Sequence, residues 1–149
     1  MFSAFVIALA LAVSSPAPFP APQSLPVTTL SAPRAMLRVQ IARTAAQRER
    51  GLMSVTRLPR HTGMVFVFDR DAPVSFWMKD TLIPLDMVFV SERGVVRAVY
   101  PNVPVVARSL PDSDIPLEQG TAKYVIELPS GEAARDGLRV GVRVGALPR

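Results

Sequence analysis

The chain contains no cysteine, a single histidine and a single tryptophan. Without cysteine it can form no disulfide, carry no thiolate nucleophile and hold no metal through sulfur. Any serine triad or histidine base would have to use His61, which lies in the loop-like stretch 59–63 with no neighbour spaced to orient it. We therefore interpret His61 as a surface residue.

Metal ligands are also scarce. Asp112-Ser113-Asp114 resembles the beginning of a calcium loop, but the glycine and the final glutamate of such a loop are missing at the required spacing. The sequence therefore predicts no metal site and no cofactor.

Positive charge exceeds negative charge, with 17 lysines and arginines against 12 acidic residues and a formal net charge of +5. Such a balance permits binding to nucleic acid or to an anionic membrane surface. The arginines, however, are scattered from Arg34 to Arg149, and no aromatic residues are interleaved with them as a stacking platform requires. We interpret them as a solvated basic surface and expect no nucleic-acid partner.

Residues 2–13 form an apolar run of the length expected for the core of a signal peptide, and too short to span a bilayer comfortably. We predict a signal peptide or N-terminal anchor over residues 1–15, followed by a linker rich in proline and alanine over residues 16–35. The pattern indicates an exported protein of the periplasm or cell envelope, which contacts a membrane only if this segment stays uncleaved. A buried N-terminal helix is the alternative.

Residues 36–149 are predicted to form one domain made mostly of strands. The capping box Thr44-Ala45-Ala46-Gln47 predicts a short helix after Thr44, and residues 130–137 predict a second one with Ser130 as its N-cap. Because residues 65–68 are apolar on both strand faces, we expect a mainly β (α+β) fold, a compact, antiparallel-rich barrel or sandwich with two short helices. Strands are predicted over residues 37–41, 64–68, 74–78, 85–90, 95–100, 124–128 and 143–147, and a loop over 101–120.

Two acidic residues, Asp86 and Glu127, lie within apolar strands and share a strand face with valines. A carboxylate in such a place has to be exposed at a strand end, or else paired and hydrogen-bonded. Lys79 and Arg50 are the candidate partners. The candidate ligand-binding residues are therefore Arg50, Trp77, Lys79, Thr81, Asp86 and Glu127.

The same residues permit a functional and a structural interpretation. In the functional one, Lys79 or Arg50 holds an anionic ligand against the flat wall of Trp77. In the structural one, they form an internal ion-pair network that fixes the strand register, with Trp77 in the core. Thr81 suits either a turn or a ligand contact.

Four segments resemble one known family. They are Arg50-Gly51-Leu52-Met53, Gly63-Met64-Val65-Phe66, the string FWMKDTLIPLD over residues 76–86, and YVIEL over residues 124–128 followed by Gly131. Together they resemble domain of unknown function 192 (DUF192), an uncharacterised protein family, over residues 37–147.

The resemblance implies a compact β-rich domain with short helices, often carried behind a signal or lipoprotein-like leader, and no established activity. The polar motif residues of the family correspond to Arg50, Lys79, Thr81, Asp86 and Glu127. The family usually has asparagine where this chain has Asp80, which adds a negative charge beside Lys79.

Three functions remain open at this point. We expect an exported domain that binds a small anionic or sugar-like (carbohydrate) ligand near Trp77 and Lys79. One alternative is a hydrolase or lyase that uses Asp86 and Glu127 as acid and base, which requires both carboxyl groups to face one cavity. The other is an accessory or scaffold protein of the envelope, in which the polar cluster is purely structural.

Overall fold

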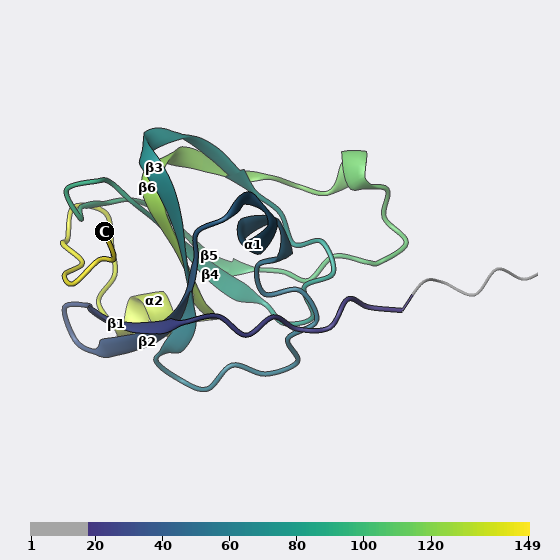
Figure 1. Ribbon diagram of the computed structural model, residues 1–149, viewed down its shortest axis with the longest axis horizontal. Coiled ribbons are helices and arrows are strands. Elements are labelled where there is room, and N and C mark those ends of the chain that lie inside the picture. Colours follow the sequence, from purple (N-terminus) through teal and green to yellow (C-terminus); the bar gives the residue numbers. More distant parts are fainter. Residues whose placement is uncertain (1–17) are drawn as a thin grey trace, which may run out of the picture.

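The computed structural model describes residues 18–149, which form one six-stranded mixed sheet in the order β1-β2-β3-β6-β4-β5 (Figure 1). Strands β2 and β3 run parallel, and all other neighbours run antiparallel. The strands are β1 (Val27–Ser31), β2 (Met36–Ala42), β3 (Thr62–Phe76), β4 (Leu85–Val90), β5 (Val96–Val103) and β6 (Glu118–Pro129). The helices are α1 (Ala45–Arg50), the 3-10 helix η1 (Asp112–Asp114) and α2 (Glu132–Arg135). The predicted mainly β fold with two short α-helices is confirmed.

The sheet does not close into a barrel, because β1 and β5 remain at its two ends. Its two faces are covered by helices and loops rather than by a second sheet. Figure 1 shows α1 and α2 on opposite sides of the ribbon formed by β3 and β6. The faces are named here after these helices.

Apolar side chains fill both faces, as the two-sided apolar strands predict. The α2 face is built on Val39, Val65, Val88, Ile126 and Leu128. The α1 face is built on Met64, Phe66, Phe76, Phe89 and Val125. On the α1 face, Phe76 packs edge-to-face on Phe66 and Phe89, with ring centroids 4.8 Å and 5.9 Å apart.

Several strand boundaries differ from the prediction. The strands predicted over residues 64–68 and 74–78 are one strand, β3, whose register against β6 shifts between Val67 and Ala72. Such an irregularity lets one strand carry the exposed polar residues 69–70 without breaking the sheet. Residues 143–147 form only isolated bridges to Ser31 and Val95 instead of a strand. The predicted loop is shorter than 101–120, because β5 and β6 extend into it from either end.

The N-terminal part of the described chain also differs. The linker predicted over residues 16–35 is too long, because Val27–Ser31 forms β1 and pairs with β2. The domain therefore begins before residue 36. The predicted signal peptide over residues 1–15 lies outside the described residues. Within residues 18–149, no helix is long and apolar enough to cross a membrane.

The two helices begin in different ways. At α1 the capping box is confirmed, since Thr44 Oγ1 accepts from the Gln47 amide at 3.2 Å and Gln47 Oε1 accepts from the Thr44 amide at 3.0 Å. At α2 the predicted N-cap, Ser130, is wrong. The N-cap is Gly131 in a left-handed conformation, and it has no side chain to cap the helix. Asp86, in β4, supplies the missing hydrogen-bond acceptor at the start of α2.

Candidate functional site

The two predicted carboxylates lie on different faces of the sheet. Asp86 is paired with Leu128, and Glu127 is paired with Met87. Paired residues share a face and successive residues alternate, so Asp86 belongs to the α2 face and Glu127 to the α1 face. The two groups cannot face one cavity, and their assignment as an acid and base pair is wrong.

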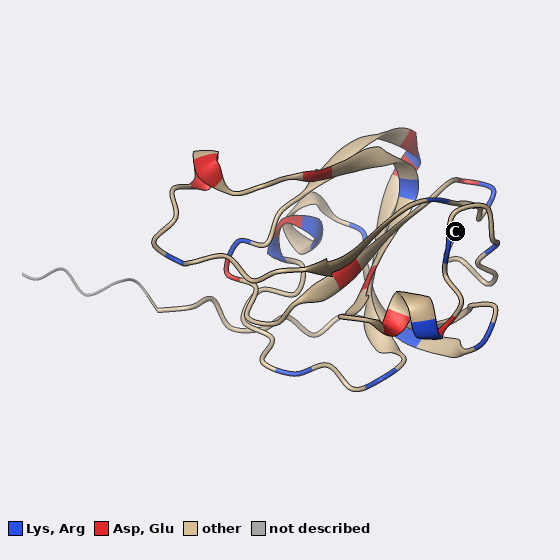
Figure 2. Ribbon diagram, turned by 180° about the vertical axis from the view of Figure 1, so that it is seen from behind, with Lys and Arg blue, Asp and Glu red and all other residues tan. Residues whose placement is uncertain are grey.

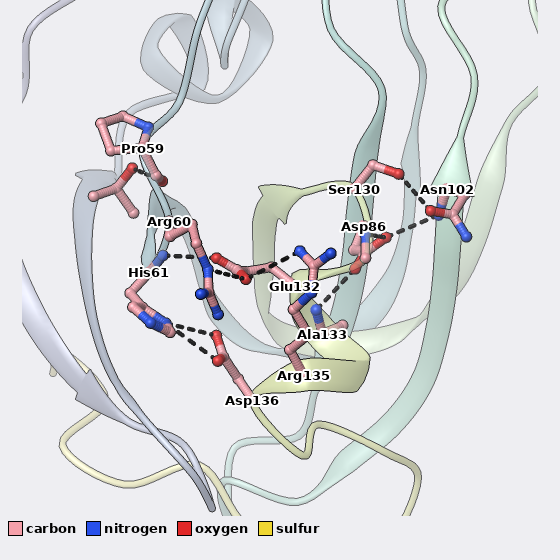
Figure 3. A network of polar contacts seen from close by, with 12 residues as sticks. Pro59, Arg60, His61, Asp86, Asn102, Ser130, Glu132, Ala133, Arg135 and Asp136 are labelled. Atoms are coloured by element: carbon pink, nitrogen blue, oxygen red, sulfur yellow. Dashed lines mark hydrogen bonds and ion pairs between the residues drawn. The ribbon is translucent and has the colours of Figure 1, made fainter.

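Asp86 is fully buried and supports the fold around α2 (Figure 3). Its carboxylate accepts hydrogen bonds from the backbone N–H groups of Asn102 at 2.8 Å, Gly131 at 3.0 Å and Ala133 at 2.8 Å. Two of these donors are at the start of α2, where N–H groups have no partner within the helix. Asp86 is thus the acceptor that Gly131 cannot provide. It is a structural residue rather than a ligand contact.

His61 contacts the same helix from the beginning of β3. Its backbone N–H donates to Glu132 Oε2 at 2.9 Å, and its Nδ1 lies 3.1 Å from Asp136 Oδ1 and 3.2 Å from Asp136 Oδ2 (Figure 3). Asp136 is 2% exposed and Glu132 is fully buried. No residue near His61 in sequence orients its ring, but Asp136, which is distant in sequence, does so.

Donor atoms of His61, Glu132 and Asp136 lie within 4.8 Å of one another, a spacing that could suit a metal ion. Glu132, however, already pairs with Arg60 at 3.2 Å and with Arg135 at 3.6 Å, and these cations oppose a divalent ion. Burial raises the pKa of Glu132, but hydrogen bonds from the His61 amide and from Arg60 outweigh burial and hold it below its ordinary value. We interpret the cluster as an ion-pair network that fastens α2 to the sheet.

Glu127 lies on the α1 face in a different environment. It is 4% exposed, and no residue within 18–149 makes a hydrogen bond or ion pair with its carboxyl group. Burial raises the pKa of Glu127 to about 8, so the group is mostly a neutral acid at pH 7 and can donate a hydrogen bond. A β-carbon at Gly63 would lie 2.0 Å from the Glu127 carbonyl oxygen, so glycine there permits the close approach of β3 and β6.

Glu127 lines a small space that we call the inner cavity, about 30 Å³ in volume. Arg50, Trp77, Lys79 and Thr81 also line this cavity. A wider space of about 550 Å³, the outer groove, shares Arg50, Trp77 and Lys79 with it. Five of the six predicted ligand-binding residues therefore meet on the α1 face, and Asp86 does not.

Lys79 and Trp77 form one wall of the outer groove. The Lys79 Nζ atom lies 5.2 Å from the centroid of the Trp77 ring and 2.5 Å from Asp112 Oδ2 in η1. The hydrogen bond with Asp112 raises the pKa of Lys79, which stays a cation at neutral pH. Trp77 is only partly buried, so its ring is a wall of the groove as well as part of the packing.

Arg50 lines the outer groove from the C-terminal end of α1. Its guanidinium donates to the carbonyl oxygen of Ala21, with Nε 3.0 Å away. Residues 18–25 cross the end of α1 here, and Gln23 Nε2 donates to the carbonyl oxygens of Gln47 at 2.8 Å and Gly51 at 2.9 Å. Figure 2 shows residues of both charge signs on α1. The groove is thus lined by charged and polar side chains, and Pro20 and Gln23 of the N-terminal segment form part of its lining.

The turn between β3 and β4 places Thr81 in the inner cavity. The Thr81 hydroxyl donates to the Lys79 carbonyl at 3.3 Å, so the turn role is observed, and the residue also lines the cavity. Asp80 has a positive φ of 51°, a conformation in which aspartate and asparagine are favoured. Its carboxylate lies 3.6 Å from Arg108, which balances the extra charge at this position.

Most residues that line the outer groove were not among the predicted candidates, and Glu49, Gln23 and Asp112 are examples. Glu49 and Gln23 line it, and Asp112 holds Lys79. The capping box placed α1 correctly, and Glu49 lies directly before Arg50 in that helix, so its position was accessible from sequence. Gln23 and Asp112 come from segments interpreted as a linker and a loop, and no local pattern connects them to the site.

The sequence profile of one family matches residues 27–146, and its description is "Uncharacterized ACR". The chain belongs to the DUF192 family. A similar crystal structure is that of a protein from Sinorhizobium meliloti 1021, provisionally described as a transcription regulator, with 30% sequence identity to this chain and a TM-score of 0.74. The alignment covers 85% of this chain and 98% of that chain.

A second similar crystal structure is that of a protein of unknown function from Novosphingobium aromaticivorans DSM 12444. It has 29% sequence identity and a TM-score of 0.72, and the alignment covers 89% of this chain and 93% of that chain. No curated protein matches the chain.

All four segments that carry the DUF192 resemblance meet at the inner cavity. Arg50 comes from the first, Phe66 from the second, Trp77 and Lys79 from the central string, and Glu127 from the last. The family match begins at residue 27, so residues 18–25, which reach over Arg50, precede the matched region. The α1 face is therefore the candidate functional site of this DUF192 domain.

Proposed function

We propose that this DUF192 domain binds a small anionic or sugar-like molecule in the outer groove, with one polar group of that molecule entering the inner cavity. One observation carries the proposal. Glu127 is 4% exposed and lines the inner cavity beside Arg50, Lys79 and the Trp77 ring, and its carboxyl group, which is not fully closed off, has no hydrogen-bond partner among residues 18–149.

Moving a carboxyl group from water into mostly apolar surroundings costs free energy, and folded proteins seldom keep one there without a reason. The same strand could carry an apolar residue at position 127, since its neighbours on this face, Val125 and Met87, are apolar. A ligand that hydrogen-bonds to Glu127 would remove the cost when it binds. The penalty in the free protein then favours the bound state.

The composition of the groove suits a small polar ligand. The Trp77 ring offers a flat apolar wall for a sugar ring or a short carbon chain. Arg50 and Lys79 offer charge-assisted hydrogen bonds to oxygen atoms. The outer groove, at about 550 Å³, is within the range typical of small-molecule sites.

Catalysis by a pair of carboxylates has lost its geometric basis, because Asp86 lies on the α2 face and holds backbone N–H groups. The description of the Sinorhizobium meliloti protein as a transcription regulator raises DNA binding as another possibility. The α-helices within residues 18–149 have six and four residues, too short to read a major groove in the usual way. Ligand binding therefore remains the proposal.

The experiment uses the fluorescence of Trp77, the sole tryptophan of the chain. The purified protein is titrated at pH 7 with acetate, sulfate, gluconate and glucose. We expect the Trp77 fluorescence to change saturably with at least one of these probes. The Lys79→Met variant should bind that probe at least fivefold more weakly.

Lys123→Met is the matched control for Lys79→Met. Lys123 also lies over an aromatic ring, that of Tyr124, and pairs with an acid, Glu92, but it is not among the groove residues. Its removal should leave binding unchanged. Saturation that is equally strong in Lys79→Met, or no response to any probe, would contradict the proposal, and the second result would favour the accessory-protein alternative.

We also propose that the domain acts in the cell envelope, as the apolar run at residues 2–13 predicts. Fractionation of cells that express the full chain, with N-terminal sequencing of the product, tests this. Recovery of the intact N-terminus in the cytoplasmic fraction would contradict it.

A further inference from the structure

The volume of the inner cavity limits what can enter it. At about 30 Å³, it holds one small polar group and not a whole ligand. The three residues that it shares with the outer groove, Arg50, Trp77 and Lys79, let one molecule occupy both spaces. The group that enters must therefore be a terminal or branching group of the ligand.

The polar neighbours of the Glu127 carboxyl group are already engaged elsewhere. Arg48 donates to the carbonyl of Val67 at 3.1 Å and lies over the Phe68 ring. Lys79 pairs with Asp112, and Arg50 donates to Ala21.

The rest of the cavity wall comes from α1, the turn after it and the sheet. Glu49 adds a negative charge from α1, and Thr81 adds a hydroxyl group. Phe66, Gly51 and Leu52 contribute no charge. Cations therefore line the cavity without forming an ion pair with Glu127.

We propose that the group entering the inner cavity is an anionic oxygen group, a carboxylate, sulfate or phosphate, which accepts a hydrogen bond from the neutral carboxyl group of Glu127 and is attracted by Arg50 and Lys79. This inference rests on the proposed function and narrows it to acidic ligands. It also makes binding depend on a proton.

The protonation state of Glu127 explains the preference. Because burial raises the pKa of Glu127 to about 8, its carboxyl group is mostly protonated at pH 7 and mostly ionised at pH 9. The protonated form donates a hydrogen bond to an anion, whereas the ionised form repels it at short range. Binding of an anion should therefore weaken as the pH rises through 8.

A cationic ligand would give the opposite result. It would pair with ionised Glu127 and would bind more tightly at pH 9 than at pH 7. It would also have to approach Arg50 and Lys79, which oppose it. The direction of the pH dependence thus separates the two ligand classes.

The test measures the dissociation constants of acetate and sulfate from pH 6 to pH 9, again by Trp77 fluorescence. Both anions keep their charge over this range, so only the protein titrates. Because the binding-competent fraction falls with the protonated fraction of Glu127, we expect about tenfold weaker binding at pH 9 than at pH 7. Methylammonium is the cationic probe and should cause no change.

Glu127→Gln is the decisive variant, because its amide donates a hydrogen bond at every pH. It should bind both anions at pH 9 as tightly as the wild type does at pH 7. Glu118→Gln, a change elsewhere on β6 that is not among the inner-cavity residues, should keep the wild-type pH dependence. Thermal unfolding of each variant confirms that it is folded.

Several results would overturn the inference. One is anion binding that does not change between pH 7 and pH 9, or that strengthens. Another is loss of anion binding in a folded Glu127→Gln protein. Binding of glucose without a response to acetate or sulfate would also overturn it, yet leave the proposed binding function in place. Absence of a response to every probe would defeat both.

Discussion

Asp86 and Glu127 differ by one position in the pairing of β4 with β6, and this single step places them on opposite faces of the sheet. Asp86 accepts three backbone hydrogen bonds, whereas Glu127 accepts none from residues 18–149. The two buried acids therefore have opposite roles. One stabilises the fold, and the other is available to a ligand.

Replacement of Asp86 should strongly reduce the stability of the fold. Asp86→Ala leaves one buried and two partly buried N–H groups without their acceptor, and we expect a loss of about 3 kcal/mol in the free energy of unfolding. Urea unfolding measures the loss. Asp114→Ala, at an exposed position whose side chain accepts a hydrogen bond from Ser113 and from no other residue within 18–149, is the control and should change stability by less than about 0.5 kcal/mol. Similar effects for the two variants would contradict the structural role of Asp86.

Glu127 should make the stability of the protein depend on pH in a defined direction. An unfolded glutamate titrates near 4.3, whereas burial raises the pKa of folded Glu127 to about 8. Between these values the folded chain holds one proton more than the unfolded chain. The contribution of this group to the free energy of unfolding therefore falls with rising pH, by up to about 1.4 kcal/mol per pH unit.

Urea unfolding of wild type and Glu127→Gln between pH 5 and pH 8 isolates this contribution. The variant lacks the titrating group, so its advantage over the wild type should grow with pH and stop growing above pH 8. A constant difference between the two proteins across this range would show that Glu127 titrates normally.

The sequence indicated where the candidate site lies better than it indicated which of the predicted residues belong to it. Arg50, Lys79 and Glu127 were identified from polar residues within apolar segments and from motif resemblance, and the fold brings them together. Strand alternation placed each acid on a face of its own strand. It could not show whether those faces coincide, because that depends on the register between β4 and β6.

Long-range contacts account for most of the other differences. The pairing of His61 with Asp136 joins residues 75 positions apart, and no local sequence pattern indicates it. Strand β1 was missed because prolines on both sides of residues 27–31 suggested an extended linker. Short local patterns also do not specify the parallel pairing of β2 with β3, or that β1 and β5 remain unpaired with each other at the two ends of the sheet.

His61 should contribute to stability through Asp136. The Asp136 carboxylate is 3% exposed, and His61 is the one side chain recorded within hydrogen-bond distance of it among residues 18–149. His61→Ala leaves this buried acid without its partner, and we expect a loss of about 2 kcal/mol. The double variant with Asp136→Asn should recover part of that loss, because it removes the buried charge. Full additivity of the two changes in urea unfolding would contradict a direct interaction.

The N-terminal segment should compete with the ligand for the same cation. The Ala21 carbonyl oxygen accepts a hydrogen bond from the guanidinium of Arg50. The Gln23 side chain fixes the segment by donating to the carbonyl oxygens of Gln47 and Gly51. Gln23→Ala removes two hydrogen bonds, so the segment should detach more often and leave Arg50 available to an anion. We expect acetate and sulfate to bind severalfold more tightly and the Leu25 amide, now bonded to Gln40 Oε1 at 2.7 Å, to exchange faster with solvent.

Gln119→Ala is the matched control for this change, because Gln119 donates to Ser75 at an exposed position outside the groove residues. It should alter neither anion affinity nor exchange at Leu25. If Gln23→Ala speeds exchange at Leu25 but leaves anion affinity unchanged, the segment does not restrict access to Arg50. If it weakens anion binding, the segment is part of the binding site, because its loss then removes contacts that the ligand needs.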